Sequence, residues 1–274
     1  MTDAAFIESL EAWRSQLDDE IRGERGLLAL GGLHWLEQGI NTVGSSPDCS
    51  ICLPKPIPRL LGALEFDGSR VRFHPDVGQS VEVNGIATQS AADLLYEDET
   101  GASTVRSGDV TFTLTRHAGR IGVRLWNAGR AREFPPRSWY DPNPEYRVQG
   151  SYTGYPAPLE IKIPDSLGRS QDGFLQGYVS FRLRGKSHKL VAAETDDGRL
   201  FLLFKDLTSG NTTYAGGRYL QTERVSEDGL VELDFNRAHN PPSAFSEFAP
   251  CSLAPKVNSL NCPVEAGERY AVFR

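Results

Sequence analysis

The chain has 274 residues, of which 39% are hydrophobic and 24% are charged, and its formal net charge is −7. This composition is typical of a folded globular protein and excludes extended disorder, and the length suffices for two domains with separate cores. The negative charge, without a stripe of arginine and lysine to offset it, argues against nucleic acid as a partner.

The amino-terminal segment predicts an amphipathic helix that opens the chain. Phe6, Leu10, Trp13, Leu17 and Ile21 recur there at helical spacing. The segment is acidic and lacks the basic start and continuous apolar run of a secretory signal. No run elsewhere reaches the ~20 apolar residues needed to cross a bilayer. The sequence therefore predicts a cytoplasmic protein without a membrane partner.

The rest of the chain predicts β-structure. The stretch LLALGGLHWLEQGINTVG is broken by glycines and indicates short strands and a turn, and from Ile40 onward short alternating runs such as RVRFH, DVTFTLTRH, YVSFRLRG and LVELDF lie between turn residues. We predict an all-β fold with two antiparallel sandwich or barrel-like domains after the helix. Residues 1–39 would hold the helix and a connecting segment, 40–130 a β-sandwich, and 131–274 a second β domain with a long irregular end.

Four cysteines raise the question of metal or redox chemistry. Cys49 and Cys52 form a C-x-x-C pair, but Cys251 and Cys262 are ten residues apart, where a structural zinc site would favour two. Side chains three apart on a strand point to opposite faces, which disfavours a shared metal. We therefore interpret the cysteines as buried thiols in a reducing compartment.

Motifs of the common enzyme classes are absent. The sequence contains no H-E-x-x-H, Gly-x-Ser-x-Gly, Walker or dinucleotide fingerprint, so it predicts no cofactor and leaves open whether the protein is an enzyme. His34 and Glu37 would lie one turn apart on a helix and offer two metal ligands. The alternative is a buried histidine bonded to a backbone carbonyl, and this interpretation is favoured.

The stretch DFNRAHNPPSAF, from Asp234 to Phe245, concentrates polar residues after the last predicted strand. Strand alternation places Glu232, Asp234 and Asn236 on one face, opposite three apolar residues. Arg237 and Asn240 follow on a loop that two prolines stiffen. Such a loop either holds side chains in a binding site or braces an irregular segment, and both interpretations remain open.

Aromatic residues and prolines crowd the predicted boundary between the two β regions. Trp139 and Tyr140 begin this run, which continues to Tyr155 and Pro158. Aromatic side chains line pockets, which favour domain junctions, but they also pack domains together. The sequence does not decide between a pocket wall and interdomain packing.

The first β region contains VGSSPDCSICLP, then EVNG at Glu82 to Gly85, then SGDVTF at Ser107 to Phe112. Over residues 40 to 126 these segments resemble the landmarks of a forkhead-associated domain. This resemblance implies a sandwich that reads phosphothreonine peptides. However, Gly44 is followed by Ser45 where that family has a phosphate-gripping arginine, and KPIPRLLGALEF offers only Arg59. We therefore expect a degenerate sandwich without phosphopeptide binding, in which Asn84-Gly85 forms a hairpin turn.

A second resemblance extends over nearly the whole chain. GGLHWLEQG, SWYDPNPEYRV, DLTSGNTTYAGGRYL and the long segment from Asp234 to Glu268 are similar to the domain of unknown function 1684 family. This family implies no mechanism. Its usual pattern has a cysteine where this chain has Ser243, so a thiol at that position cannot pair with Cys251 here.

Three hypotheses for function follow. The first is a small-molecule binder or enzyme in which Asp234 is a candidate general base, with ligand contacts from Arg218, Asn236, Arg237, Asn240, Trp139 and Tyr140. The second is a phosphate-independent protein-interaction module on the amino-terminal sandwich. The third is a metal-dependent enzyme that uses His34, His239 and cysteine or carboxylate ligands.

Overall fold

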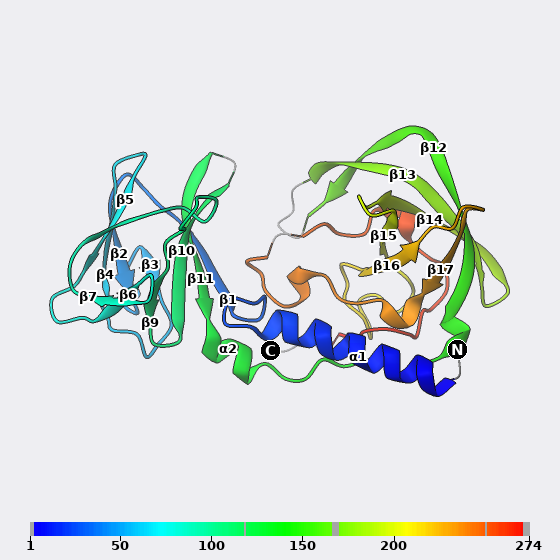
Figure 1. Ribbon diagram of the computed structural model, residues 1–274, viewed down its shortest axis with the longest axis horizontal. Coiled ribbons are helices and arrows are strands. Elements are labelled where there is room, and N and C mark those ends of the chain that lie inside the picture. Colours follow the sequence, from blue (N-terminus) through cyan, green and yellow to red (C-terminus); the bar gives the residue numbers. More distant parts are fainter. Residues whose placement is uncertain (1–2, 118, 166–169, 250, 271–274) are drawn as a thin grey trace. The chain divides into compact units, whose positions relative to one another are not determined.

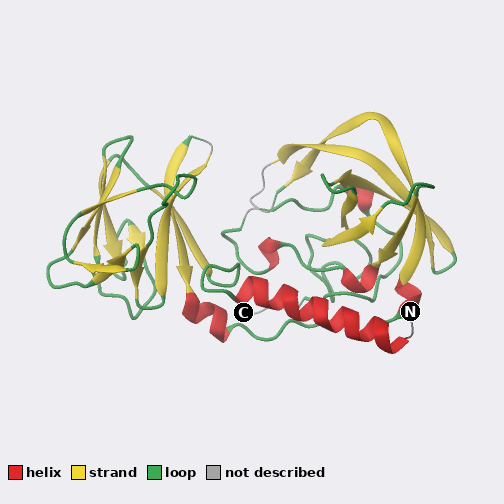
Figure 2. Ribbon diagram, in the orientation of Figure 1, coloured by secondary structure: helices red, strands yellow, loops and turns green. Residues whose placement is uncertain are grey.

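The computed structural model describes residues 3–117, 119–165, 170–249 and 251–270. Most of its regular secondary structure is β-strand, with one long helix at the start, as Figure 2 shows. The chain divides into two compact units. Unit 1 comprises residues 1–18 and 135–274, and unit 2 comprises residues 19–134. The predicted all-β class with an amino-terminal helix is confirmed.

Unit 2 is built from two β-sheets. A six-stranded sheet has the order β1-β11-β10-β9-β6-β7, and a five-stranded sheet has the order β3-β2-β4-β5-β8. The strands and the short helix after them are β1 (Leu30–Trp35), β2 (Gly39–Gly44), β3 (Ile51–Cys52), β4 (Gly62–Phe66), β5 (Val71–Pro75), β6 (Val81–Val83), β7 (Ile86–Thr88), β8 (Ala92–Leu94), β9 (Val105–Ser107), β10 (Val110–His117), β11 (Arg120–Asn127) and α2 (Ala128–Glu133).

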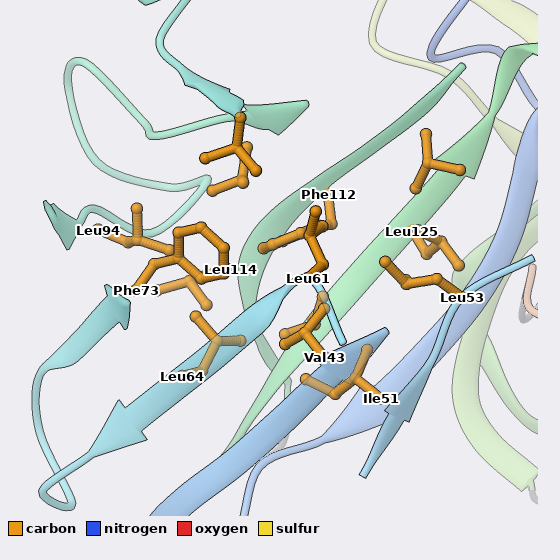
Figure 3. Close-up of a cluster of buried hydrophobic side chains, with 14 of the residues drawn as sticks. Val43, Ile51, Leu53, Leu61, Leu64, Phe73, Leu94, Phe112, Leu114 and Leu125 are labelled. Atoms are coloured by element: carbon orange, nitrogen blue, oxygen red, sulfur yellow. The ribbon is translucent and has the colours of Figure 1, made fainter. Parts of the chain in front are cut away.

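The core of unit 2 lies between these two sheets. Alternate residues of each strand are buried, so Val71 and Phe73 point inward from β5 while Arg72 is exposed. Figure 3 shows side chains from both sheets, among them Leu64 and Leu114, gathered in one apolar layer. This burial of alternating residues is what fixes the register of the strands.

The predicted hairpin at Asn84-Gly85 is present. Strands β6 and β7 pair antiparallel on either side of these two residues. Asn84 has φ of 54° and Gly85 has φ of 77°, the left-handed conformation that both central positions of a type I′ turn require. Asparagine and glycine adopt this conformation at the lowest cost, so the local sequence is sufficient to place the turn.

Unit 1 contains a six-stranded antiparallel sheet of order β16-β15-β14-β13-β12-β17. Its two end strands, β16 and β17, also contact each other, so the sheet is nearly closed into a barrel. The strands and 3-10 helices are η1 (Pro144–Tyr146), β12 (Arg147–Pro164), β13 (Ser170–Leu183), β14 (Lys186–Glu194), β15 (Arg199–Phe204), β16 (Arg218–Arg224), β17 (Leu230–Asp234), η2 (Phe235–Arg237), η3 (Pro242–Ala244) and η4 (Lys256–Asn258).

Strands β12 and β13 form the longest pair and arch over the barrel in Figure 1. Strand β12 continues through two alternating runs, RVQGSY and LEIKIP, although Pro156 and Pro158 lie between them. A bulge between Gly154 and Leu159 allows this, because it lets the strand bend around Pro156 and Pro158 without ending.

Helix α1 (Asp3–Arg22) confirms the amphipathic prediction. Phe6 and Leu10 on its apolar stripe are buried, and the Arg147 guanidinium lies 4.8 Å from the centre of the Phe6 ring. Unit 1 takes in the first 18 residues, so most of this helix packs within it. In the part of the chain that the structure describes, no helix is long and apolar enough to span a membrane.

Candidate functional site

The polar segment after β17 folds differently from the predicted strand. Val231, Leu233 and Phe235 are buried on one side, as alternation predicts, but β17 ends at Asp234 and the chain turns into η2. Asn236 therefore lies beyond the strand and is fully buried, so it does not share a strand face with Glu232 and Asp234. The Asp234 side chain caps the turn by accepting a hydrogen bond from the Asn236 backbone, and this bond ends the strand.

Asp234 lies among its own neighbours. One carboxylate oxygen accepts from both the backbone N–H and the side-chain amide of Asn236, at 3.1 and 2.9 Å. The other oxygen lies 3.6 Å from Arg237 Nε and 3.8 Å from Arg147 Nε. Burial raises the pKa of Asp234, and the hydrogen bonds from Asn236 and the two guanidinium groups oppose that rise.

Arg218 and Asn236 brace the chain from inside. Arg218 is 1% exposed and donates to the carbonyls of Val264 and Ala266 and to Asp206 Oδ2. Asn236 exchanges two hydrogen bonds with the backbone of Asn143, both of 2.9 Å. These contacts hold the carboxy-terminal segment and the entry to β12 against the barrel, so we leave both residues out of the candidate site.

Arg237 reaches toward helix α1. Its Nη2 atom donates to Ser9 Oγ at 3.0 Å, and its guanidinium lies 5.4 Å from the centre of the Trp13 ring. The side chain is 31% exposed. Because an arginine over an indole face is attracted by the ring quadrupole, Arg237 helps to fix the helix on the barrel.

Asn240 takes part in a buried network around Glu268. Arg137 donates from Nε and Nη2 to the two carboxylate oxygens of Glu268, at 2.7 and 2.6 Å, and both side chains are at most 3% exposed. The backbone N–H of Asn240 donates to the same carboxylate at 2.7 Å. Two atoms of this network are buried without a hydrogen-bond partner among the described residues: Arg137 Nη1, a donor, and Asn240 Oδ1, an acceptor.

Two tryptophans and a histidine lie beside this network. Trp13 and Trp139 meet edge to face at 5.7 Å, and Trp13 meets the His239 ring at 5.8 Å. The Arg137 guanidinium lies 4.9 Å from the centre of the Trp139 ring. Both tryptophans are only partly buried, so their rings have surface left for a further contact.

The tautomer of His239 follows from its hydrogen bond to a backbone carbonyl. Its Nδ1 atom lies 3.2 Å from the carbonyl oxygen of Arg237, which can only accept, so Nδ1 carries the proton. Nε2 is then an acceptor in the neutral ring. Burial lowers the pKa of His239 to about 4, and the charge of Arg137 adds to this effect. The ring is therefore neutral near pH 7.

Tyr140 lies at the edge of this group. Its backbone N–H donates to Gly267 O at 2.9 Å, and its carbonyl accepts from Arg14 at 3.3 Å. Its hydroxyl bonds the hydroxyl of Thr212. The structure thus brings Asn240, Arg237, Trp139 and Tyr140 to one side of unit 1, together with helix α1.

Sequence reasoning did not single out Arg137 or Glu268. Arg137 directly follows two prolines, and Glu268 is the last residue of the segment that resembles the family, but neither lies in a motif that indicates a chemical role. Trp13 was expected only as part of the apolar helix stripe, and His239 only as a metal ligand. The signal that unites them is spatial, because the two partners of the ion pair are 131 residues apart.

A separate hollow of about 670 Å³ lies against the unit 1 sheet. Residues of β12, β13 and β14 line it, and Leu230 of β17 completes it. None of the predicted site residues contributes to this hollow, whose lining is Gln149, Gly150, Ser151, Ser180, Phe181, Arg182, Ser187, His188, Lys189 and Leu230.

The cysteine and metal predictions have mixed outcomes. Cys251 and Cys262 are buried, but Cys52 is exposed and Cys49 is half-buried, so the prediction of buried thiols is wrong for the C-x-x-C pair. The side chain of Cys52 leaves the sandwich because β3 is a two-residue edge strand of which only Ile51 points inward.

The metal hypothesis finds no ligand set. Within the described ranges, no three side chains of histidine, cysteine, aspartate or glutamate are grouped so as to hold a metal ion. His34 and His239 belong to different units. His34 lies on β1 and not on a helix, so it does not approach Glu37 by a helical turn, and burial lowers its pKa.

The fold defines a β protein whose unit 1 is a barrel-like sheet braced by buried arginine and asparagine. The family model "Protein of unknown function (DUF1684)" matches residues 132–269. The chain belongs to this family.

A solved structure gives a further comparison. The solution NMR structure of an uncharacterized protein from Haloarcula marismortui is 34% identical in sequence, covering 53% of this chain and 82% of that chain with a TM-score of 0.44. A comparison with curated proteins found no match.

Proposed function

We propose that unit 1 binds a small polar molecule at a site that we call the Arg137 site, formed by Trp13, Arg137, Trp139, His239 and Asn240. The observation that supports this proposal is that Arg137 Nη1 and Asn240 Oδ1 are both buried without a hydrogen-bond partner among the described residues. The two residues both bond the Glu268 carboxylate, Arg137 through Nε and Nη2 and Asn240 through its backbone N–H. Buried polar atoms are nearly always bonded, and an unmade bond costs about 1–3 kcal/mol. A ligand with an acceptor for Arg137 and a donor for Asn240 would remove that cost.

The ion pair with Glu268 suits Arg137 to this role. Two of its three nitrogens are held by the carboxylate, so the guanidinium has one orientation and presents Nη1 without rearrangement. A site that is rigid before binding loses little conformational entropy when the ligand arrives.

The aromatic residues define the shape of the ligand. Trp13 and Trp139 offer flat apolar surface, and neutral His239 adds an acceptor at Nε2. A compact molecule with a flat or apolar part and a carboxylate, carbonyl or phosphate oxygen next to a hydroxyl or amine fits these groups. If the ligand is a substrate, His239 is better placed than Asp234 to accept a proton from it, because Asp234 is committed to Asn236 and two arginines.

A thermal-shift screen of the full chain against a metabolite library tests the proposal, because a ligand that binds only the native state raises the melting temperature. A true ligand stabilises the wild type and not the Arg137→Lys or Asn240→Ala variants. The control is Arg147→Lys, which alters an arginine of the same unit whose partner Glu232 is half-exposed. A ligand that stabilises all four proteins equally binds elsewhere, and that result would reject the Arg137 site.

For unit 2 we propose, as a second function, a phosphate-independent protein-interaction surface on a forkhead-associated-like sandwich. Three large apolar side chains are strongly exposed there: Ile40 at 63%, Val77 at 95% and Ile86 at 72%. Arg59 donates to Ser46 Oγ at 3.3 Å, so its guanidinium is already engaged by the chain. The test is binding of the full chain to an array of threonine peptides with and without phosphate. Binding only to the phosphorylated peptides would contradict this proposal.

A further inference from the structure

Among the residues that the structure describes, strand β12 has an unpaired edge in its second half. Its first residues, Arg147–Ser151, pair with β17, and near its end Leu253 N–H donates to the carbonyl of Pro164 at 2.8 Å. Between these two points, from Thr153 to Ile163, β12 pairs only with β13 among the described residues. An open edge presents backbone donors and acceptors to any strand that fits it.

The sequence along this edge is complementary to itself. Leu159–Ile163 reads LEIKI. When two copies run antiparallel about Ile161, Glu160 of each copy stands opposite Lys162 of the other, and Leu159 stands opposite Ile163. Opposite charges and apolar pairs that face each other across antiparallel strands stabilise the pairing, whereas like charges oppose it. Other registers lose this match, so the segment specifies both the partner and the register.

Apolar side chains are exposed on the β12–β13 pair around Leu159–Ile163. Leu159 is 45% exposed, and Phe174 on β13, opposite Glu160, is 56% exposed. The Lys162 side chain is 70% exposed and forms an ion pair with Asp172 of β13 in the same protomer. A neighbouring strand would cover part of the two apolar side chains and would leave Lys162 close to carboxylates of both copies.

Two prolines limit how far the pairing extends. Pro158 has no N–H to donate, and the carbonyl of Pro164 is already bonded to Leu253. Five residues, Leu159–Ile163, are left for the contact. In a two-fold pairing, the unpaired β12 edge of each protomer is occupied by that of its partner. The assembly therefore stops at two chains and does not propagate into fibres.

We propose that the protein forms a symmetric homodimer in which Leu159–Ile163 of one protomer pairs antiparallel with the same segment of its partner. This proposal is independent of the Arg137 site. The short contact predicts a weak, concentration-dependent dimer that salt weakens, because the two Glu160–Lys162 pairs lie in solvent.

Sedimentation velocity of the full chain over micromolar to submillimolar concentrations tests the dimer. The wild type is expected to shift from the mass of one chain, 30.2 kDa, toward twice that mass. Glu160→Lys places like charges opposite Lys162 and is expected to raise the dissociation constant at least about tenfold. The double variant Glu160→Lys with Lys162→Glu restores opposite charges and dimerisation. Glu145→Lys, an exposed charge reversal in the same unit, is the control and leaves the dimer intact.

A disulfide tests the register. In the proposed pairing Ile161 faces its own copy, so Ile161→Cys is expected to give a covalent dimer under mild oxidation, whereas Val77→Cys, at an exposed position of unit 2, does not exceed the wild-type background. A wild type that stays monomeric throughout, a dimer that Glu160→Lys weakens no more than Glu145→Lys does, or a double variant that fails to dimerise would each overturn the proposal.

Discussion

Arg137 and Glu268 form a bidentate ion pair that is almost completely withdrawn from water, with both side chains at most 3% exposed. The pair connects the segment before β12 with the segment that follows η4. Because each charge depends on the other for compensation, the pair affects both the stability of unit 1 and the site that we propose beside it.

Removing one charge of this pair should destabilise the protein strongly. We expect Glu268→Gln to lower the free energy of unfolding of unit 1 by about 3 kcal/mol, because it leaves the buried guanidinium without a counter-charge. Urea unfolding followed by tryptophan fluorescence measures the change. The matched control, Glu232→Gln, breaks the more exposed pair with Arg147 and should cost about 1 kcal/mol or less. Equal losses of unfolding free energy in the two variants would show that burial does not determine how strongly an ion pair affects stability here.

A disulfide should form when Ser243 is replaced by cysteine. Cys251 Sγ lies 2.6 Å from Ser243 Oγ, so the two side chains already meet. Under oxidation, Ser243→Cys should lose the reactivity of both thiols toward a thiol reagent in denaturant and should gain about 2 kcal/mol of stability from loop closure. The same variant under reducing conditions is the control. Two thiols that stay reactive after oxidation would contradict this geometry.

The turn at Asn84-Gly85 should depend on glycine. Gly85 has φ of 77°, and among the described residues no atom beyond its chain neighbours lies within 4 Å of the position that a Cβ would take. Backbone strain is therefore the main cost of a side chain. We expect Gly85→Ala to destabilise unit 2 by about 1 kcal/mol. The control is Gly31→Ala in the same unit, where φ is ordinary and the nearest contact is 3.6 Å. Chemical denaturation compares the two variants.

His239 should make stability depend on pH. Its pKa falls from 6.5 in the unfolded chain to about 4 in the folded protein. Below pH 6.5 the unfolded state therefore binds a proton that the folded state does not, and stability falls by up to about 1.4 kcal/mol per pH unit until pH 4. Above pH 6.5 both states are neutral and the contribution is constant.

The comparison of wild type with His239→Gln isolates this contribution. The variant should show a shallower loss of stability between pH 6.5 and 4, measured by urea unfolding at each pH. Asp234 acts in the opposite direction, because its raised pKa favours the folded state as pH falls, but it is present in both proteins and cancels in the difference. Parallel pH profiles for the two proteins would show that His239 is not held neutral by the fold.

Part of the site was accessible to sequence reasoning. The polar cluster after β17 is evident because polar residues and prolines follow an alternating strand. Asn240 and Trp139 both contact Glu268, Asn240 through a hydrogen bond from its backbone N–H and Trp139 through a β-bridge. The sequence does not show which of these polar residues line the proposed site and which stabilise the fold from inside. Arg218 and Asn236 became internal braces, because the carbonyls and the aspartate that bind them come from segments far along the chain.

Features that depend on neighbours along the chain can be predicted without the folded structure. Helix α1 follows from apolar residues at helical spacing, the all-β class follows from alternating runs, and the Asn84-Gly85 turn follows from the backbone freedom of those two residues. The unbroken course of β12 through its prolines and the ion pair of Arg137 with Glu268 emerge only from the folded chain. The reason is physical: backbone preference and periodic burial act over a few residues, whereas the pairing of buried charges depends on which distant segments the fold brings into contact.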